Sequence, residues 1–218
     1  MVAQYIYNLP PVSYDLAMTK IDLHAHSTYS DGLHDPEEVL EEAKKAGLKV
    51  IAITDHNRPH NMKEKVALAK KFGIESIEAL EISTSHHGAT LHILGYSRDF
   101  NDQFLIEKLQ KENDGYSERT QRFIKHVNST GIVSVDMTDL EKKFKGFRHD
   151  FQVIVAAAEK LNLPIVEIKH KLKDGFEREK GQWMLSPQEA IDIIHQAGGI
   201  AIWAHPKVVV GTKELDFK

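Results

Sequence analysis

Short apolar segments alternate with amphipathic helical patterns along most of this chain, and this alternation constrains the fold more than any other feature. The segments 20–26, 48–56, 74–83, 89–96 and 200–206 have the length and apolar character of strands. Helical patterns cover 35–47, 61–73 and 186–199, with capping residues and proline at the start of the first and the last, and glycine at each end. Alternating strands and helices predict an α/β fold with a parallel sheet or barrel.

The middle of the chain departs from this alternation. From residue 100 to about 183 the pattern is polar and helical, with helices expected at about 99–131, 136–145 and 149–162. The segments 144–150 and 167–183 are rich in Lys, Arg and Gly and are expected to be loops. We therefore expect a barrel that begins in 20–99, is interrupted by a helical insertion at 100–183, and continues in 184–218.

Composition removes several classes of function. The chain has no cysteine, which excludes disulfides, thiol catalysis and iron–sulfur clusters. Its formal net charge of −4 argues against a basic nucleic-acid clamp. No apolar run approaches the length of a membrane span, and the first residues do not resemble a secretory signal, so no membrane association and a cytoplasmic location are expected. The unusual feature is histidine, with 13 copies.

The first strand carries two of these histidines. In KIDLHAH, side chains alternate across the strand, so His24 and His26 point to the same face and could chelate one metal ion. Taken alone, the pair could equally be polar residues at a solvated strand end. Asp31 follows in STYSDG, where a lone aspartate before glycine is usually a turn residue.

The other strands repeat the pattern. Asp55 and His56 end the second strand, Glu81 interrupts the third, His92 the fourth, and His205 lies at the end of the fifth. Each residue alone could be a satisfied core or loop residue, but a buried carboxylate needs a cation or hydrogen-bond donors. Together they would gather at the ligand-binding end of a parallel sheet or barrel. Five imidazoles with two or three carboxylates suit Zn²⁺, Mn²⁺ or Fe²⁺, and they are enough for two or three ions bridged by Glu81.

The segments DLHAHSTYSDG, ITDHN, EALEIST, LHILGY and AGGIAIWAHP resemble successive motifs of the polymerase-and-histidinol-phosphatase (PHP) family of metal-dependent phosphoesterases. The resemblance covers 20–96 and 186–206, and it implies a distorted (β/α)₇ barrel with up to three metals. The helical insertion resembles that of a subgroup acting on nucleotides and short oligonucleotides. The implied ligands form three sets, one for each metal: His24, His26 and Glu81; Asp31 and His56; Glu81, His92 and His205.

The resemblance also bears on Asp55, on the insertion and on the end of the chain. Asp55 matches a family position that is not usually a direct ligand, so we expect it to support the ligands from outside. The insertion of the subgroup carries an Arg-Pro-His run that reaches substrate phosphate, and here the matching residues are Arg148, His149 and Asp150. The family's late Ser-Asp-x-His motif has no match after His205. We therefore expect a barrel that is incomplete at its C-terminal end, and a gene product continuing for about 60–80 residues, to the usual size of a barrel.

The ligand set predicts a phosphoesterase in which a hydroxide held between metals attacks phosphorus. The expected substrate is a phosphomonoester of a nucleotide or small metabolite, or the end of a short oligonucleotide. One alternative is a non-catalytic metal-binding remnant acting as a regulatory or interaction module. Another is a hydrolase of the amidohydrolase type, although its usual bridging lysine or late aspartate is not seen. The oligomeric state stays open.

Overall fold

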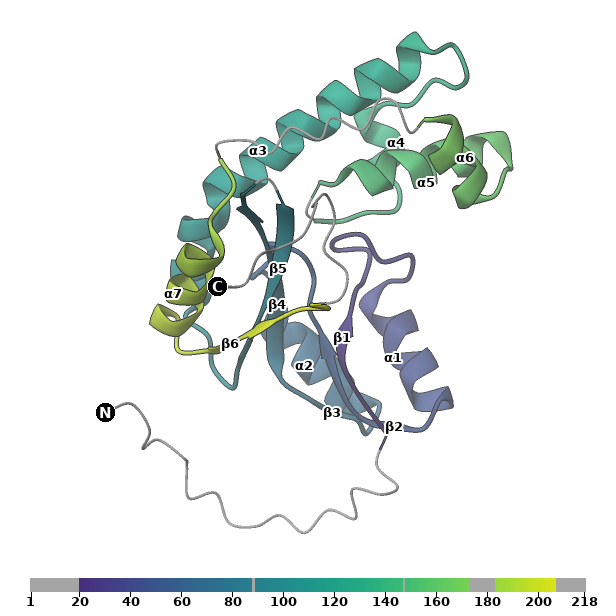
Figure 1. Cartoon of the computed structure of the whole chain (residues 1–218). Coiled ribbons are helices and arrows are strands. Elements are labelled where there is room, and N and C mark those ends of the chain that lie inside the picture. The colour runs from purple at the N-terminus through teal and green to yellow at the C-terminus, as the bar shows by residue number, and fades with distance from the viewer. Residues whose placement is uncertain (1–19, 88, 147, 173–182, 207–218) are drawn as a thin grey trace, which may run out of the picture.

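The computed structural model describes residues 20–87, 89–146, 148–172 and 183–206. Figure 1 shows a central group of strands with α1 and α2 on one side, α7 on the other, α4–α6 beyond the strand ends, and α3 extending from α7 toward them. The elements are β1 (Lys20–Ala25), α1 (Pro36–Lys45), β2 (Leu48–Ile53), α2 (Met62–Lys71), β3 (Glu75–Ser76), β4 (Glu78–His86), β5 (Ala89–Ser97), α3 (Asp102–Ser129), α4 (Met137–Glu141), α5 (Asp150–Leu161), α6 (Ile165–Lys171), α7 (Pro187–Gln196) and β6 (Ile200–Trp203).

The helix starts follow from local sequence. Asp35 caps α1 by accepting from the backbone N–H groups of Glu37 and Glu38, while the Glu38 side chain accepts from the Asp35 N–H. Ser186 forms the same reciprocal capping box at α7. Each arrangement satisfies N–H groups that the first helical turn leaves without partners. After α1, Gly47 takes a φ of 77°, a left-handed conformation that glycine adopts without strain.

The strands form two three-stranded sheets. In the first, β1, β2 and β3 are parallel, as expected. In the second, β5 runs antiparallel to both β4 and β6, so the expectation of parallel pairing is wrong there. Only residues 87 and 88 separate β4 from β5, and a connection this short permits a hairpin but no parallel crossover. The strands of the described residues do not close into a barrel.

The reversal of β5 decides where its histidine lies. His92 stands near the start of β5, directly opposite Ser83 of β4. Because β5 runs backwards, its first half lies at the same end of the sheet as the last half of β4. Opposite residues of an antiparallel pair point to the same face, so His92 shares a face with Ser83 and, two residues earlier, Glu81.

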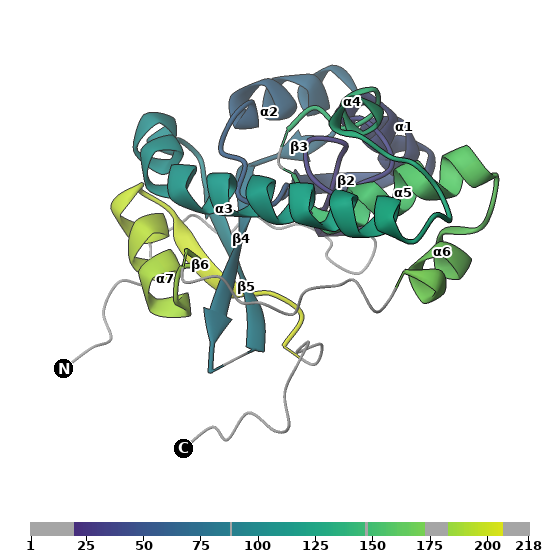
Figure 2. The same ribbon diagram turned by 90° about the horizontal axis from the view of Figure 1, so that it is seen from above.

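Helix α3 connects two hydrophobic cores. Its first half contributes Leu105 and Leu109 to a core with β4, β5 and α7. Its last half contributes Phe123 and Val127 to a core built with α4, α5 and α6. Figure 2 shows α3 running from the side of α7 across to α5 and α6. The helices of the middle segment therefore have a core of their own and share one long helix with the sheet.

Two expected loops are partly helical. Helix α6 (165–171) overlaps the first part of the expected loop 167–183. Residues 173–182 of that loop lie outside the described ranges. The apolar residues at 165 and 168 pack on the core of α3–α5, which sequence periodicity in so short a segment does not reveal. In 144–150, His149 caps α5 and Asp150 is its first residue. No helix in the described ranges combines the length and apolar character that a membrane crossing requires.

Candidate metal centre

The carboxylate of Glu81 is the centre of a histidine cluster. Glu81 lies in β4 and is 1% exposed. Its Oε2 lies 3.0 Å from Nε2 of His24, on β1, and 3.0 Å from Nε2 of His26, which directly follows β1. Nε2 of His56, which follows β2, lies 3.5 Å from the same oxygen. Three imidazoles from the parallel sheet thus converge on one carboxylate oxygen of the antiparallel sheet.

The second carboxylate oxygen of Glu81 faces the remaining two histidines. Oε1 lies 3.1 Å from Nδ1 of His92 and 3.2 Å from Nε2 of His205. His205 follows β6, next to Ala204, whose N–H donates to the carbonyl of His92. The backbone of His205 has a φ of 31°, an uncommon value for a side chain of this size. Two imidazoles of the antiparallel sheet therefore complete the ring around Glu81.

Asp31 brings a second carboxylate to the cluster. Its Oδ1 lies 3.4 Å from Nδ1 of His26, and its Oδ2 lies 3.7 Å from Nε2 of His56. All seven residues that the sequence marked as possible ligands therefore lie together. Two groups have ligand atoms that are all within 4.8 Å of one another: His24, Glu81 and His205, and His26, His56 and Glu81. Glu81 belongs to both groups, although their members divide differently from the three sets implied by the resemblance.

The charges of these groups depend on burial and on each other. Burial opposes the charge of Glu81, but the imidazole of His56 and the hydrogen bonds from neighbouring histidines hold its pKa well below the usual range. Burial lowers the pKa of His56 to about 3, so this ring is neutral near pH 7. Burial also opposes the charge of Asp31, and His56 and His26 hold its pKa below the usual value. Ionised carboxylates and a neutral imidazole are the forms that bind metals.

The donor atoms fit divalent cations. Nε2 of His24 lies 3.1 Å from Nε2 of His26, and Nδ1 of His92 lies 3.2 Å from Nε2 of His205. Lone pairs packed this closely repel each other unless a proton or a cation lies between them. Imidazole nitrogens with carboxylate oxygens are the ligands of Zn²⁺, Mn²⁺ and Fe²⁺. The residues present therefore suit such ions.

Asp55 is hydrogen-bonded to the loop after His26 and to Lys65. It is fully buried and accepts hydrogen bonds from Ser27 N (2.8 Å), Ser27 Oγ (2.7 Å), Ser30 Oγ (2.8 Å) and Lys65 Nζ (2.9 Å). These bonds fix the loop between His26 and Asp31. Lys65, 5% exposed on α2, was missed by sequence reasoning because a lysine in a polar helix usually faces solvent.

Of the two residues expected to reach substrate, His149 contacts the cluster, and Arg148 contacts other residues of the middle segment. The ring of His149 stacks on His56 with centroids 6.2 Å apart and planes 7° apart. Its Nδ1 accepts from the N–H of Phe151. The guanidinium of Arg148 donates to the carbonyl of Phe144 at 3.1 Å and lies 3.4 Å from Glu141.

The middle segment contacts the loops of the cluster directly. The N–H of Lys145 donates to Thr28 O at 2.9 Å, and the amide of Gln152 donates to Ser30 O. Figure 1 shows α3–α6 above the ends of β1 and β2, where these loops emerge. Sequence reasoning did not identify these docking contacts, because they join residues more than a hundred positions apart.

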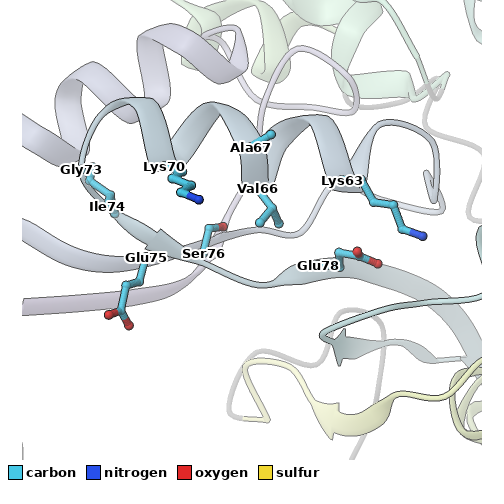
Figure 3. A pocket seen from close by; sticks show the side chains of 9 residues that line it. All are labelled: Lys63, Val66, Ala67, Lys70, Gly73, Ile74, Glu75, Ser76 and Glu78. Carbon is cyan, nitrogen blue, oxygen red and sulfur yellow. The ribbon is translucent and has the colours of Figure 1, made fainter.

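The remaining histidines and the cavity beside α2 lie outside the cluster. His86 ends β4, pairs with Ala89 at the tip of the β4–β5 hairpin, and is exposed. Further histidines at 34, 60, 87, 126, 170 and 195 are exposed or half-buried. A cavity of about 610 Å³ lies between α2 and the start of β4 (Figure 3). It is lined by Lys63, Val66, Ala67, Lys70, Gly73, Ile74, Glu75, Ser76 and Glu78, without a histidine, so it is separate from the cluster.

A cluster of histidines and carboxylates on an α/β scaffold is the class of site that metal-dependent hydrolases use. The sequence profile of the PHP domain matches residues 22–161, and the chain belongs to this family. The resemblance seen in the sequence is therefore confirmed.

Relatives and solved structures support the same class. The chain is 32% identical to a 5'-3' exoribonuclease of Haemophilus influenzae, over 86% of this chain and 69% of the relative. It is 29% identical to a 3',5'-nucleoside bisphosphate phosphatase of Chromobacterium violaceum, over 87% and 67%. The chain thus spans about two thirds of the length of these relatives. Both names denote hydrolases of phosphate esters, and the expected hydrolase class is confirmed.

Two solved structures share the fold. One is described as an amidohydrolase from Chromobacterium violaceum with bound sulfate, and it superposes with a TM-score of 0.77 at 24% identity over 89% of this chain and 70% of that one. The other is described as a putative metal-dependent phosphoesterase from Bifidobacterium adolescentis, with a TM-score of 0.74 at 18% identity over 86% and 67%. At these identities the likeness concerns the fold alone.

Proposed function

We propose that the chain is a metal-dependent phosphoesterase that hydrolyses phosphomonoesters of nucleotides or small metabolites, or the ends of short oligonucleotides. The observation that carries the proposal is the buried carboxylate of Glu81, surrounded by five imidazole nitrogens at 3.0–3.5 Å. Support for the substrate class comes from the relatives named as a nucleoside bisphosphate phosphatase and a 5'-3' exoribonuclease.

The chain's own residues would hold two or three ions of zinc, manganese or iron. Such ions supply Lewis acidity, which lowers the pKa of water toward about 7 and offsets charge on a phosphoryl group. Glu81 stays ionised and would be shared between ions, and neutral His56 keeps a ring nitrogen available. The proposed ligands are His24, His26, Asp31, His56, Glu81, His92 and His205, with Asp55 holding the loop behind them.

His149 and Arg148 would contact the phosphate. Because Nδ1 of His149 accepts from Phe151 N, the neutral ring carries its proton on Nε2, which can donate to a phosphate oxygen. The pair between Arg148 and the 55%-exposed Glu141 is long and solvated, so a phosphate can replace the carboxylate as a partner.

The proposed architecture is the distorted (β/α)₇ barrel of the family, with the barrel in 20–99 and 184–218 and the helical insertion in 100–183. The two outer strands support this arrangement. Ile21 and Leu23 of β1 are 47% and 44% exposed, and Ile200 and Ile202 of β6 are 60% and 49% exposed. Exposed apolar side chains on edge strands support the proposal that further structure packs against these strands.

The test is hydrolysis by protein loaded with Mn²⁺. Substrates are p-nitrophenyl phosphate, AMP, a nucleoside 3',5'-bisphosphate and a 5'-phosphorylated oligoribonucleotide. We expect phosphate or mononucleotide release by the wild type, and a loss of about 100-fold or more in Glu81→Gln because a shared ligand is removed. His86→Ala, at the exposed hairpin tip, is the matched control and should keep full activity.

The pattern of products identifies the function. Phosphate from the bisphosphate indicates a phosphatase, and stepwise mononucleotides from the oligomer indicate an exonuclease. If metal-loaded protein leaves every substrate intact, the proposed catalysis is wrong. In that case one tightly held ion, measured by elemental analysis, would identify a metal-binding module without catalysis.

A further inference from the structure

A buried tyrosine of α3 contacts the histidine cluster through one serine. Tyr116 is 4% exposed and hydrogen-bonds to the side chain of Ser83. Ser83 Oγ lies 3.3 Å from Nδ1 of His56, on the side of the ring away from Glu81 and Asp31. Hydrogen bonds among Tyr116, Ser83 and His56 thus link the middle segment to a proposed metal ligand.

Ser83 is fixed in this position by the backbone. Its N–H donates to Oδ1 of Asn57 at 2.9 Å, and the residue is 3% exposed. It lies in the middle of the β4–β5 ladder, opposite His92. Its hydroxyl therefore has a defined place between the imidazole of His56 and the phenol of Tyr116.

The hydrogen bonds among Tyr116, Ser83 and His56 decide which nitrogen of the His56 imidazole carries the proton. A neutral imidazole has one N–H and one lone pair. Nε2 faces the carboxylates, so it can bind a cation only if the proton is on Nδ1. Ser83 Oγ then accepts from Nδ1–H and donates its own proton to the oxygen of Tyr116. Burial raises the pKa of Tyr116 above its usual value, so the phenol stays neutral.

The same helix holds the residue after His56. Nδ2 of Asn57 donates to Glu112 at 3.3 Å, and Nδ2 of Asn113 donates to the carbonyl of Asn57 at 3.2 Å. Asn57 has a φ of 44°, a left-handed conformation that needs such support. One turn of α3 therefore contacts both the backbone after His56 and, through Ser83, its ring.

We propose that Tyr116 is a positioning residue that acts through Ser83 to hold His56 in the tautomer with Nε2 available for a cation. The proposal rests on the metal centre proposed above. Tyr116 lies on α3, so the long helix of the insertion would have a role in the metal centre. Without the phenol oxygen, the Ser83 hydroxyl can donate to Nδ1 of His56 and favour the tautomer with the proton on Nε2.

The test uses Tyr116→Phe, Ser83→Ala and the double variant in the full chain. The first readout is the ¹⁵N chemical shifts of the His56 ring in metal-free protein, which report the tautomer directly. We expect the Nδ1–H form in the wild type and a mixture of tautomers in both single variants. Tyr96→Phe is the control, since it removes a buried tyrosine hydroxyl that donates to Leu23 O, and it should leave the His56 signals unchanged.

The second readout is Zn²⁺ affinity by calorimetry. Loss of an outer hydrogen bond to a ligating histidine costs about 10–100-fold in affinity, so we expect a loss of this order in Tyr116→Phe. Adding Tyr116→Phe to Ser83→Ala should reduce the Zn²⁺ affinity by less than about a further 2-fold. Both substitutions break the same series of hydrogen bonds, so their effects on affinity are not additive.

Unchanged His56 shifts in Tyr116→Phe, or additive losses in the double variant, would overturn the proposal and leave Tyr116 as a packing residue against Trp183. The shifts are measured without metal or substrate. A failure of the proposed catalysis therefore shows in the hydrolysis assay, and a failure of the tautomer proposal shows here.

Discussion

His56 and Glu81 form a single parallel bridge that joins the two sheets, and their side chains meet at 3.5 Å between Nε2 and Oε2. The backbone bonds on either side run from Asn57 N to Glu81 O (2.8 Å) and from Glu81 N to Asp55 O (3.3 Å). The parallel and antiparallel sheets are thus joined at the residues that the proposed ions would share. Binding of cations should consequently stabilise the junction.

We predict that saturating Mn²⁺ or Zn²⁺ raises the Tm of the wild-type protein. A ligand present at 100 times its Kd adds about 2.7 kcal/mol to the free energy of unfolding. Glu81→Gln should lose most of this increase. Glu75→Gln, an exposed carboxylate of β3, should keep it. Differential scanning calorimetry with and without metal measures both, and equal increases in the two variants would contradict a shared role for Glu81.

We predict that Asp55→Asn strongly destabilises the protein. The change leaves the buried ammonium of Lys65 without its carboxylate, which costs about 3–5 kcal/mol in the free energy of unfolding. The matched control is Asp99→Asn, where the same kind of pair with Lys63 is largely exposed and is worth less than about 1 kcal/mol. Urea unfolding of both variants provides the comparison, and similar losses would argue against a special role of the buried pair.

We predict that Glu112 makes the protein less stable as pH rises. Burial raises the pKa of this carboxyl from 4.5 to about 8, so between these values the native state holds a proton that the unfolded state has released. Its contribution therefore falls with rising pH, by at most about 1.4 kcal/mol per pH unit, and stops falling above pH 8. Glu112→Gln should have a smaller slope of unfolding free energy against pH over this window. A slope equal to that of the wild type would show that other groups cause the dependence.

We predict that Gly146→Ala weakens the docking of the middle segment. A Cβ at this position would lie 2.2 Å from the carbonyl oxygen of Tyr29, a backbone atom that cannot move freely. Overpacking of this kind costs about 1–3 kcal/mol, and it should also reduce hydrolysis because the loop with Asp31 shifts. Lys142→Ala, at an exposed position nearby, is the control. Wild-type stability and activity in Gly146→Ala would show that this contact tolerates displacement.

Local sequence signals determined the helix starts and the identity of the clustered residues. Asp35 and Ser186 cap helices because their oxygens meet N–H groups only two or three residues away. His24 and His26 share a face because side chains alternate along any strand. Such effects act over a few residues, so they can be read from the chain itself.

Only the tertiary structure decided how the ligands divide around Glu81 and which partners Lys65, Ser83 and Tyr116 find. The direction of β5, in contrast, follows from its two-residue connection to β4, which is too short for a parallel crossover. A buried polar group finds its partner on a distant element: Lys65 on α2 reaches Asp55, and Tyr116 on α3 reaches Ser83. The free energy of burying such groups depends on partners brought together by folding, which spacing along the chain does not specify.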